Sequence, residues 1–106
     1  MADSPSLAII IEGSPHLPPP LLRELYAITG RSSVDLTSAI RAGADVYAAA
    51  LFGNDHVQVV PRLEKTAAFC EQNGLSFRVE ETYEGETSRI DAATMRSILE
   101  SSDGHH

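Results

Sequence analysis

Three glycines divide this chain into short helical segments, and that division most constrains its fold. Gly30, Gly43 and Gly74 each follow a stretch in which apolar residues recur at helical spacing. Such spacing is typical of a helix with one buried face, and glycine suits the left-handed position after a helix. The sequence therefore predicts three short helices. In the second of them the apolar positions are Val34, Leu36 and Ile40.

The starts of these helices are also marked. Proline suits the first helical turn, so the first helix is expected to begin near Pro19. Ser32 stands three residues before Asp35, a capping-box arrangement that predicts the start of the second helix. The third segment contains Pro61, which a helix interior tolerates poorly because proline lacks an N–H. Two interpretations of residues 55–61 stay open: a helix kinked at the proline, which we favour, or a short hairpin strand.

Three other segments have the character of strands. Residues 7–11, LAIII, are almost wholly apolar, as expected of a central strand, and residues 45–52 form a second candidate. Residues 75–81 alternate between apolar and polar side chains. A loop is expected at YEGE, followed by a helix over residues 89–100 capped by Ser88 with Asp91.

The order of these elements predicts an α+β fold. Three strands with helices packed on one face make a two-layer sandwich, in the order β-α-α-β-α-β plus a C-terminal helix. A chain of 106 residues with 42% apolar residues suffices for one core. We therefore expect a flexible lead-in at 1–6, a single domain at 7–101 and a disordered tail at 102–106.

The charge is negative and unevenly placed. The formal net charge is −7, and residues 80–106 hold seven acids and two arginines. Such a surface repels phosphate backbones and anionic lipid, which argues against nucleic acid or membrane and favours a basic protein partner. The apolar run near the N-terminus is too short for a signal peptide or a membrane span, so we expect a cytoplasmic protein.

This order of elements resembles the C-terminal domain of the bacterial ribosomal stalk protein. Thr29-Gly30 lies between the first two helices and Gly74 before the last strand, as in that family. The resemblance covers roughly residues 7–81 and implies a stalk-like fold.

The stalk domain recruits translation factors through basic residues on two adjacent helices. Arg23 matches one of these basic positions, but Tyr26 stands where a second would be. Where the family has a lysine-bearing helix, this chain has Val34, Asp35, Leu36 and Thr37. The resemblance therefore implies the fold without the factor contact, because such a contact depends on charge steering.

The sequence offers no set of residues typical of a catalytic centre, a cofactor site or a metal site. Cys70 paired with His16 or His56 could act as a nucleophile, but Cys70 lies on the apolar face of its helix, where a free cysteine behaves as a small hydrophobe. A single cysteine also excludes an internal disulfide and a multi-cysteine metal site. We expect a protein that is not an enzyme and has no cofactor.

Three functions fit these observations. The first is a protein-interaction module, a cytoplasmic adaptor or regulator; the second is an acidic inhibitor or immunity-type protein that masks a basic enzyme surface; the third is a small-molecule-binding domain. A homodimer through a sheet edge is a further expectation, with the second or the third strand at the edge. The candidate contact residues are Arg23, Tyr26, Arg31 and Ser32 at the helix corner, and Glu80, Glu81, Glu84 and Glu86 near the acidic end.

Overall fold

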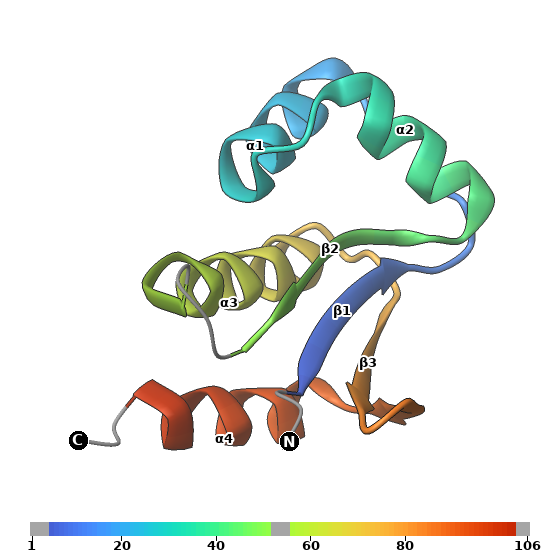
Figure 1. The fold of residues 1–106 in the computed structure, drawn as a ribbon. Helices are drawn as coiled ribbons and strands as arrows, with labels where there is room; N and C mark the ends of the chain where they lie inside the picture. Colours follow the sequence, from blue (N-terminus) through green and yellow to red (C-terminus); the bar gives the residue numbers. More distant parts are fainter. Residues whose placement is uncertain (1–4, 52–55, 104–106) are drawn as a thin grey trace.

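Strand β1 lies inside a four-stranded antiparallel sheet (Figure 1). The computed structural model describes residues 5–51 and 56–103. The strand order is β2-β1-β3-β4, with β1 at Ser6–Ile11, β2 at Asp45–Ala50, β3 at Phe77–Tyr83 and β4 at Glu86–Ile90. The α+β prediction is confirmed, while the predicted count of three strands is wrong.

Four helices complete the fold: α1 (Pro19–Thr29), α2 (Ser33–Ala42), α3 (His56–Gln72) and α4 (Ala92–Asp103). Helix α3 packs directly on β1 and β2, and α4 packs on α3 and β3. Helix α1 contacts α3, while α2 contacts β2 (Figure 1). The helices α1 and α2 therefore form one end of the molecule and α4 with the β3–β4 hairpin the other.

The core lies between the sheet and its helices. In β1 the side chains of Leu7, Ile9 and Ile11 are fully buried and belong to one core cluster. Alternate residues of a strand point to opposite faces, so these three define the helix-bearing face of the sheet. The cluster continues into the helices through Leu25, Leu36, Leu63, Phe69, Met95 and Leu99. It is almost wholly aliphatic, as expected for a chain without tryptophan.

Strand β2 contains an irregularity that increases burial. Ile9 of β1 faces Tyr47, whereas the next residue, Ile10, faces Asp45, so Val46 is an extra residue in the ladder. Such a bulge interrupts the strict alternation of side chains. As a result, Val46 and Tyr47 both belong to the core cluster.

The predicted ends of α1 and α2 are confirmed. Gly30 and Gly43 cap the two helices in left-handed conformations, with φ of 79° and 68°. The Ser32 hydroxyl accepts the backbone N–H of Asp35 at 3.1 Å, which caps α2. The prediction that Val34 lies on the buried face of this helix is wrong. Its side chain is 75% exposed, because it lies on the opposite side of the helix from Leu36.

Of the two interpretations of residues 55–61, the helix is confirmed from His56 onward, and the hairpin strand is wrong; Asp55 lies outside the described residues. The helix runs through Pro61, which is exposed. Burial of Val59, Val60 and Leu63 on the core side compensates for the hydrogen bond that the proline cannot donate.

The segment after β3 differs from the sequence prediction. Glu84 and Gly85 have φ of 53° and 81°, the two positive values of a type I′ hairpin turn. The YEGE segment therefore reverses the chain into β4, and Ser88 pairs with Glu81 across the hairpin. The proposed cap at Ser88 is wrong.

Helix α4 instead begins after Asp91. The Asp91 carboxylate accepts the backbone N–H of Thr94 at 2.7 Å. Met95 and Leu99 face the core, and Arg96 forms a two-pronged ion pair with Glu71 of α3, with N–O distances of 2.8 and 3.1 Å. The last helix thus packs against the domain.

The predicted termini are only partly described. Strand β1 begins at Ser6 and α4 continues to Asp103, whereas residues 1–4 and 104–106 lie outside the described residues. Among the helices of the described part, none combines the length and the apolar character that crossing a membrane requires.

We expect the Asp91→Ala variant to unfold at a lower urea concentration than the wild type, and Ser88→Ala to unfold at the wild-type midpoint. Hydrogen bonds from the side chain and backbone of Thr94 lower the pKa of Asp91. The contribution of the cap is therefore complete above the unfolded-state pKa and is lost as the pH falls through the lowered value. Urea titrations at neutral and acidic pH test this; an equal loss in Ser88→Ala would contradict it.

Candidate functional site

The corner between α1 and α2 is an internal junction. The buried Thr29 hydroxyl donates to the carbonyl oxygen of Leu25 at 2.9 Å and accepts the backbone N–H of Arg31 at 3.1 Å. Gly30 is left-handed, and a Cβ placed there would lie 3.3 Å from Nη1 of Arg62. Backbone geometry therefore explains the Thr-Gly pair without reference to a ligand.

Two arginines connect this corner to the rest of the fold. Nη1 of Arg31 donates to the carbonyl oxygen of Asp45 in β2 at 2.7 Å and lies 3.7 Å from its carboxylate. Nη1 of Arg62, from α3, donates to the carbonyl oxygen of Thr29 at 3.4 Å. This carbonyl is at the negative end of α1, where a cation is favourable. The sequence analysis missed the role of Arg62, because the pairing is decided by the packing of α3 on α1.

The four residues predicted at the corner therefore separate into two pairs. Arg31 and Ser32 make the internal hydrogen bonds described above. Arg23 is exposed, and the Tyr26 side chain is 51% exposed. Arg23 and Tyr26, three residues apart on α1, share one helix face and are free to contact a partner.

The arginines differ in whether the fold uses them internally. Five of the seven make hydrogen bonds or ion pairs with other described residues: Arg31, Arg62, Arg78, Arg89 and Arg96. Within the described part of the chain, Arg23 and Arg41 make neither. Both lie on the helix pair α1–α2.

Arg41 belongs to an exposed face of α2 that the sequence analysis missed. Val34, Thr37, Ser38 and Arg41 follow the i, i+3, i+4, i+7 spacing of one helix face, a signal already present in the sequence. They line a shallow depression of about 300 Å³ together with Ser33. We call the exposed faces of the two helices, carrying Arg23, Tyr26, Val34, Thr37 and Arg41, the α1–α2 surface.

A second, smaller cavity adjoins this face. It measures about 120 Å³ and lies where the loop after β1 meets α1 and α2. Its polar lining consists of Ser14, His16, Thr37 and Arg41, so Thr37 and Arg41 line both depressions. Neither lining contains an aspartate or glutamate. The small cavity is below the size usual for small-molecule sites, and the larger is open, which suits a surface contact better.

The predicted acidic cluster is dispersed. Glu80 and Glu81 are successive residues of β3, so their side chains lie on opposite faces of the sheet. Glu84 occupies the hairpin turn and Glu86 begins β4, both exposed. The hairpin tip also carries Tyr83, whose side chain is 44% exposed.

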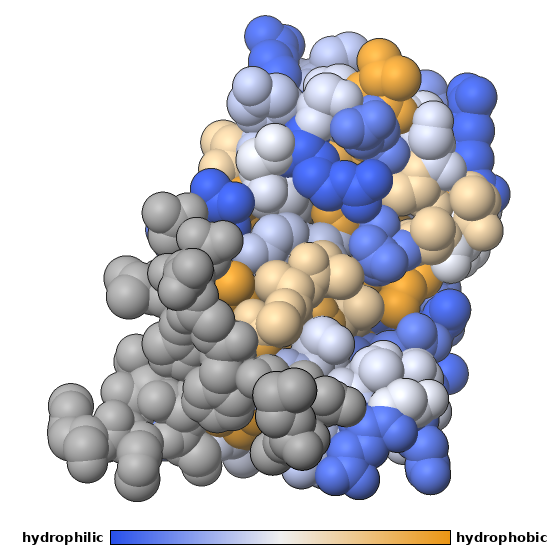
Figure 2. Space-filling view, viewed as in Figure 1, coloured by the Kyte–Doolittle hydropathy of each residue, from blue (hydrophilic) through white to orange (hydrophobic). Residues whose placement is uncertain are grey.

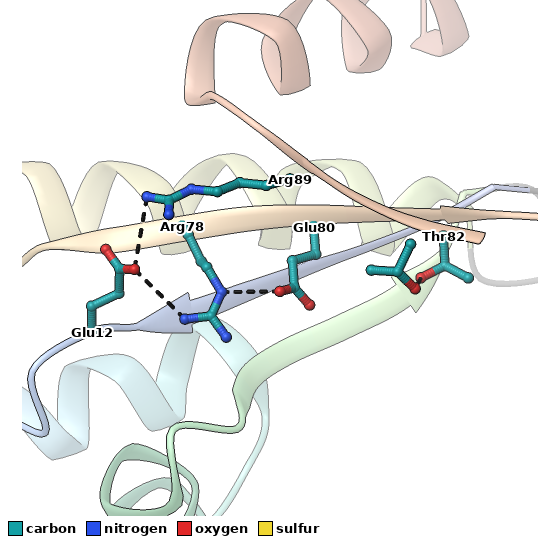
Figure 3. A network of polar contacts seen from close by, with 6 residues as sticks. Glu12, Arg78, Glu80, Thr82 and Arg89 are labelled. Carbon is teal, nitrogen blue, oxygen red and sulfur yellow. Dashed lines mark hydrogen bonds and ion pairs between the residues drawn. The ribbon is translucent and has the colours of Figure 1, made fainter. Parts of the chain in front are cut away.

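Glu80 belongs to a balanced set of charges on the outer face of the sheet (Figure 3). Its Oε2 lies 2.9 Å from Nε of Arg78, and Oε2 of Glu12 lies 3.6 Å from Arg78 and 3.7 Å from Arg89. The hydroxyls of Thr82 and Thr87 continue the polar surface, 2.8 Å apart. Two cations and two anions cancel here, so this face offers no strong field to a charged partner.

Cys70 is unsuited to nucleophilic chemistry. Its side chain is fully buried, and burial, with a smaller contribution from the Glu71 charge, raises the pKa of the thiol to about 12. The thiol is therefore protonated at neutral pH. His16 lines the small cavity, and the side chain of His56 is not among those described.

Metal ligands are likewise dispersed: no group of three or more histidine, cysteine or acidic side chains gathers within the described ranges.

Comparison with known proteins adds no functional information. No protein-family model matches the chain, and neither the curated proteins nor the solved structures searched give a match. The stalk resemblance stays a prediction.

We expect Thr29→Val to lower the free energy of unfolding by about 1–3 kcal/mol, because it leaves the Arg31 N–H without an acceptor. Thr66→Val is the matched control. The Thr66 hydroxyl is also buried, but it only donates to the carbonyl of Arg62 at 2.6 Å. Removing it leaves no donor unpaired, so a much smaller change is expected. Equal losses in urea titrations of both variants would contradict this account of the corner.

Native Cys70 should react with iodoacetamide at pH 8 much more slowly than the urea-unfolded chain does, as measured by mass spectrometry over time. The raised pKa also makes stability pH-dependent: above the unfolded-state value of 9.0, only the unfolded thiol ionises, so the free energy of unfolding falls as the pH rises. A native rate close to the unfolded rate would contradict the burial of this thiol.

Proposed function

We propose that this protein is a protein-interaction module that binds an acidic segment of a partner through the α1–α2 surface. One observation carries the proposal: the two arginines left without internal partners both lie on this helix pair, beside its exposed apolar side chains. Elsewhere in the described chain, the arginines are engaged within the fold.

The apolar groups of the α1–α2 surface suit a protein contact. Tyr26 and Val34 are two of the three large hydrophobic side chains identified as exposed in the described residues. Tyrosine and arginine are enriched among residues that contribute most to binding, because each combines apolar area with hydrogen bonding. Single exposed hydrophobic residues are common, so it is their combination with the free arginines that supports the proposal.

The electrostatics favour an acidic segment rather than an acidic domain. The chain as a whole carries −7, so long-range repulsion opposes a partner of strong negative charge. At short range, Arg41 borders two depressions without carboxylates, where it can pair with a carboxylate of the partner. Binding of this kind weakens as salt rises.

The hairpin tip supports a second candidate function, the masking of a basic enzyme surface. Tyr83 is exposed, and Glu84 and Glu86 beside it make no ion pair with described residues. A basic partner would approach this end of the molecule, opposite the α1–α2 surface.

The test is to capture partners from the host lysate with tagged protein and then to measure the affinity of each identified partner. Arg23→Glu with Arg41→Glu should weaken binding at least about tenfold, and Tyr26→Ala should act in the same direction. Arg89→Glu is the matched control: it reverses the charge of an exposed arginine on the outer sheet face.

The opposite pattern would reject the proposal. If Glu84→Lys with Glu86→Lys abolishes binding while the double arginine variant binds as the wild type, the contact lies at the hairpin tip and the second candidate holds. Equal weakening by Arg89→Glu would show a general charge effect and no defined surface.

A further inference from the structure

Strand β2 leaves backbone hydrogen-bonding groups unpaired at one edge of the sheet. Among the described residues it is an outer strand, and β1 is the strand it pairs with. The Leu51 N–H donates to the carbonyl of Pro5 at 2.8 Å, so Leu51 and Pro5 form a hydrogen-bonded pair of the ladder. In an antiparallel ladder, hydrogen-bonded and non-hydrogen-bonded pairs alternate along the strand. The backbone N–H and C=O groups of Ala49 therefore also face β1, whereas those of Ala48 and Ala50 point away from it.

Within residues 5–51 and 56–103, this edge lacks the features that usually protect one. Ala48 and Ala50 are exposed, and no charged side chain occurs between Val46 and Leu51. The surface over β2 is accordingly apolar in Figure 2 (pale orange). The beginning of the strand is closed, because Arg31 donates to the carbonyl of Asp45 beside the bulge. Native proteins normally block such edges with charges, prolines or a covering segment.

The opposite edge of the sheet is protected. Strand β4 is a residue shorter than β2, and its residues Glu86 and Arg89 are charged and exposed. In the described part of the chain, β4 is therefore protected by charge, whereas a short apolar segment of β2 is left open. This is the arrangement expected if the β2 edge has a partner.

We propose that two copies of this chain associate by antiparallel pairing of β2 with β2, centred on Ala49. In this register Ala48 faces Ala50 of the second copy, and the two-fold axis repeats the pair, giving four backbone hydrogen bonds. Ala49 then faces Ala49 of the second copy in a non-hydrogen-bonded pair. The two strands approach closely at such a pair, and the small alanine side chain fits there. The segment is thus complementary to itself.

Charge also favours a second copy at this edge. In the resulting eight-stranded sheet, the two β4 strands and their acidic hairpins lie at the far ends. Seven strand spacings separate them by roughly 34 Å, several times the screening length in physiological salt. Pairing through β4 would instead place the acidic hairpins side by side. This inference does not rest on the proposed function, because the α1–α2 surface takes no part in it.

The interface is small, so the dimer is weak. Four backbone hydrogen bonds and three alanines bury less than a standard stable interface. We expect the average mass in sedimentation experiments to rise from the monomer toward twice that value between about 10 µM and about 1 mM protein. Over the same range, the amide protons of Ala48 and Ala50 should become protected from exchange. Added salt should not weaken this association, unlike a contact made through arginines.

Two variants test the edge, and one controls for charge. Ala50→Lys places a charge on the edge, and Ala48→Pro removes an edge-facing donor without touching the bonds to β1; each should weaken association at least about tenfold. Ala93→Lys introduces the same charge at an exposed position of α4, away from the β2 edge, and this variant should associate as the wild type does. Circular dichroism confirms that each variant is folded.

Three outcomes would overturn the proposal. A wild-type mass that stays at the monomer value at every concentration shows that the edge does not self-associate. Dimers that persist in both Ala50→Lys and Ala48→Pro show another interface. Association that is lost equally in Ala93→Lys reflects net charge alone.

Discussion

Packing of α3 against β1 is the interaction on which the rest of this structure depends. The inward side chains of β1 are fully buried, and α3, which packs on this strand, buries Leu63, Ala67 and Phe69 in the same core cluster. The other elements attach to this pair: β2 and β3 flank β1, α1 packs on α3, and α4 packs on α3 and β3. With no tryptophan, stability rests on many aliphatic contacts, and loss of any one of them removes only a part of the core.

Because the helices pack against one face only, the other face and the edges of the sheet have to be stable in water. The β3–β4 half of the outer face achieves this with alternating cations and anions, Glu12, Arg78, Glu80 and Arg89 (Figure 3). The β2 half carries alanines instead. This difference between the two halves is why self-association is expected at β2 and not at β4.

Internal use of arginine shapes the functional surface in the same way. Arg31 and Arg62 hold the α1–α2 corner to β2 and α3, and Arg96 holds α4 to α3. The two arginines that remain, Arg23 and Arg41, lie on the helices of the corner. A corner fixed by internal hydrogen bonds gives these exposed groups a rigid base, which lowers the entropy lost on binding.

The sequence by itself determined the features that depend on a few neighbouring residues. The left-handed caps at Gly30 and Gly43 and the Ser32 cap follow from local backbone preferences, and so does the single buried face of each helix. Local signals also competed: Ser88 with Asp91 has the spacing of a cap, but Glu84-Gly85 has the geometry of a hairpin turn, and β3 offered the strand that made the hairpin favourable. Only the tertiary structure decided which acids lie on which face, which arginines are engaged and which strand is left at the edge. Those outcomes depend on register and on packing between residues far apart in the chain, where the free energy comes from partners that a local pattern does not specify.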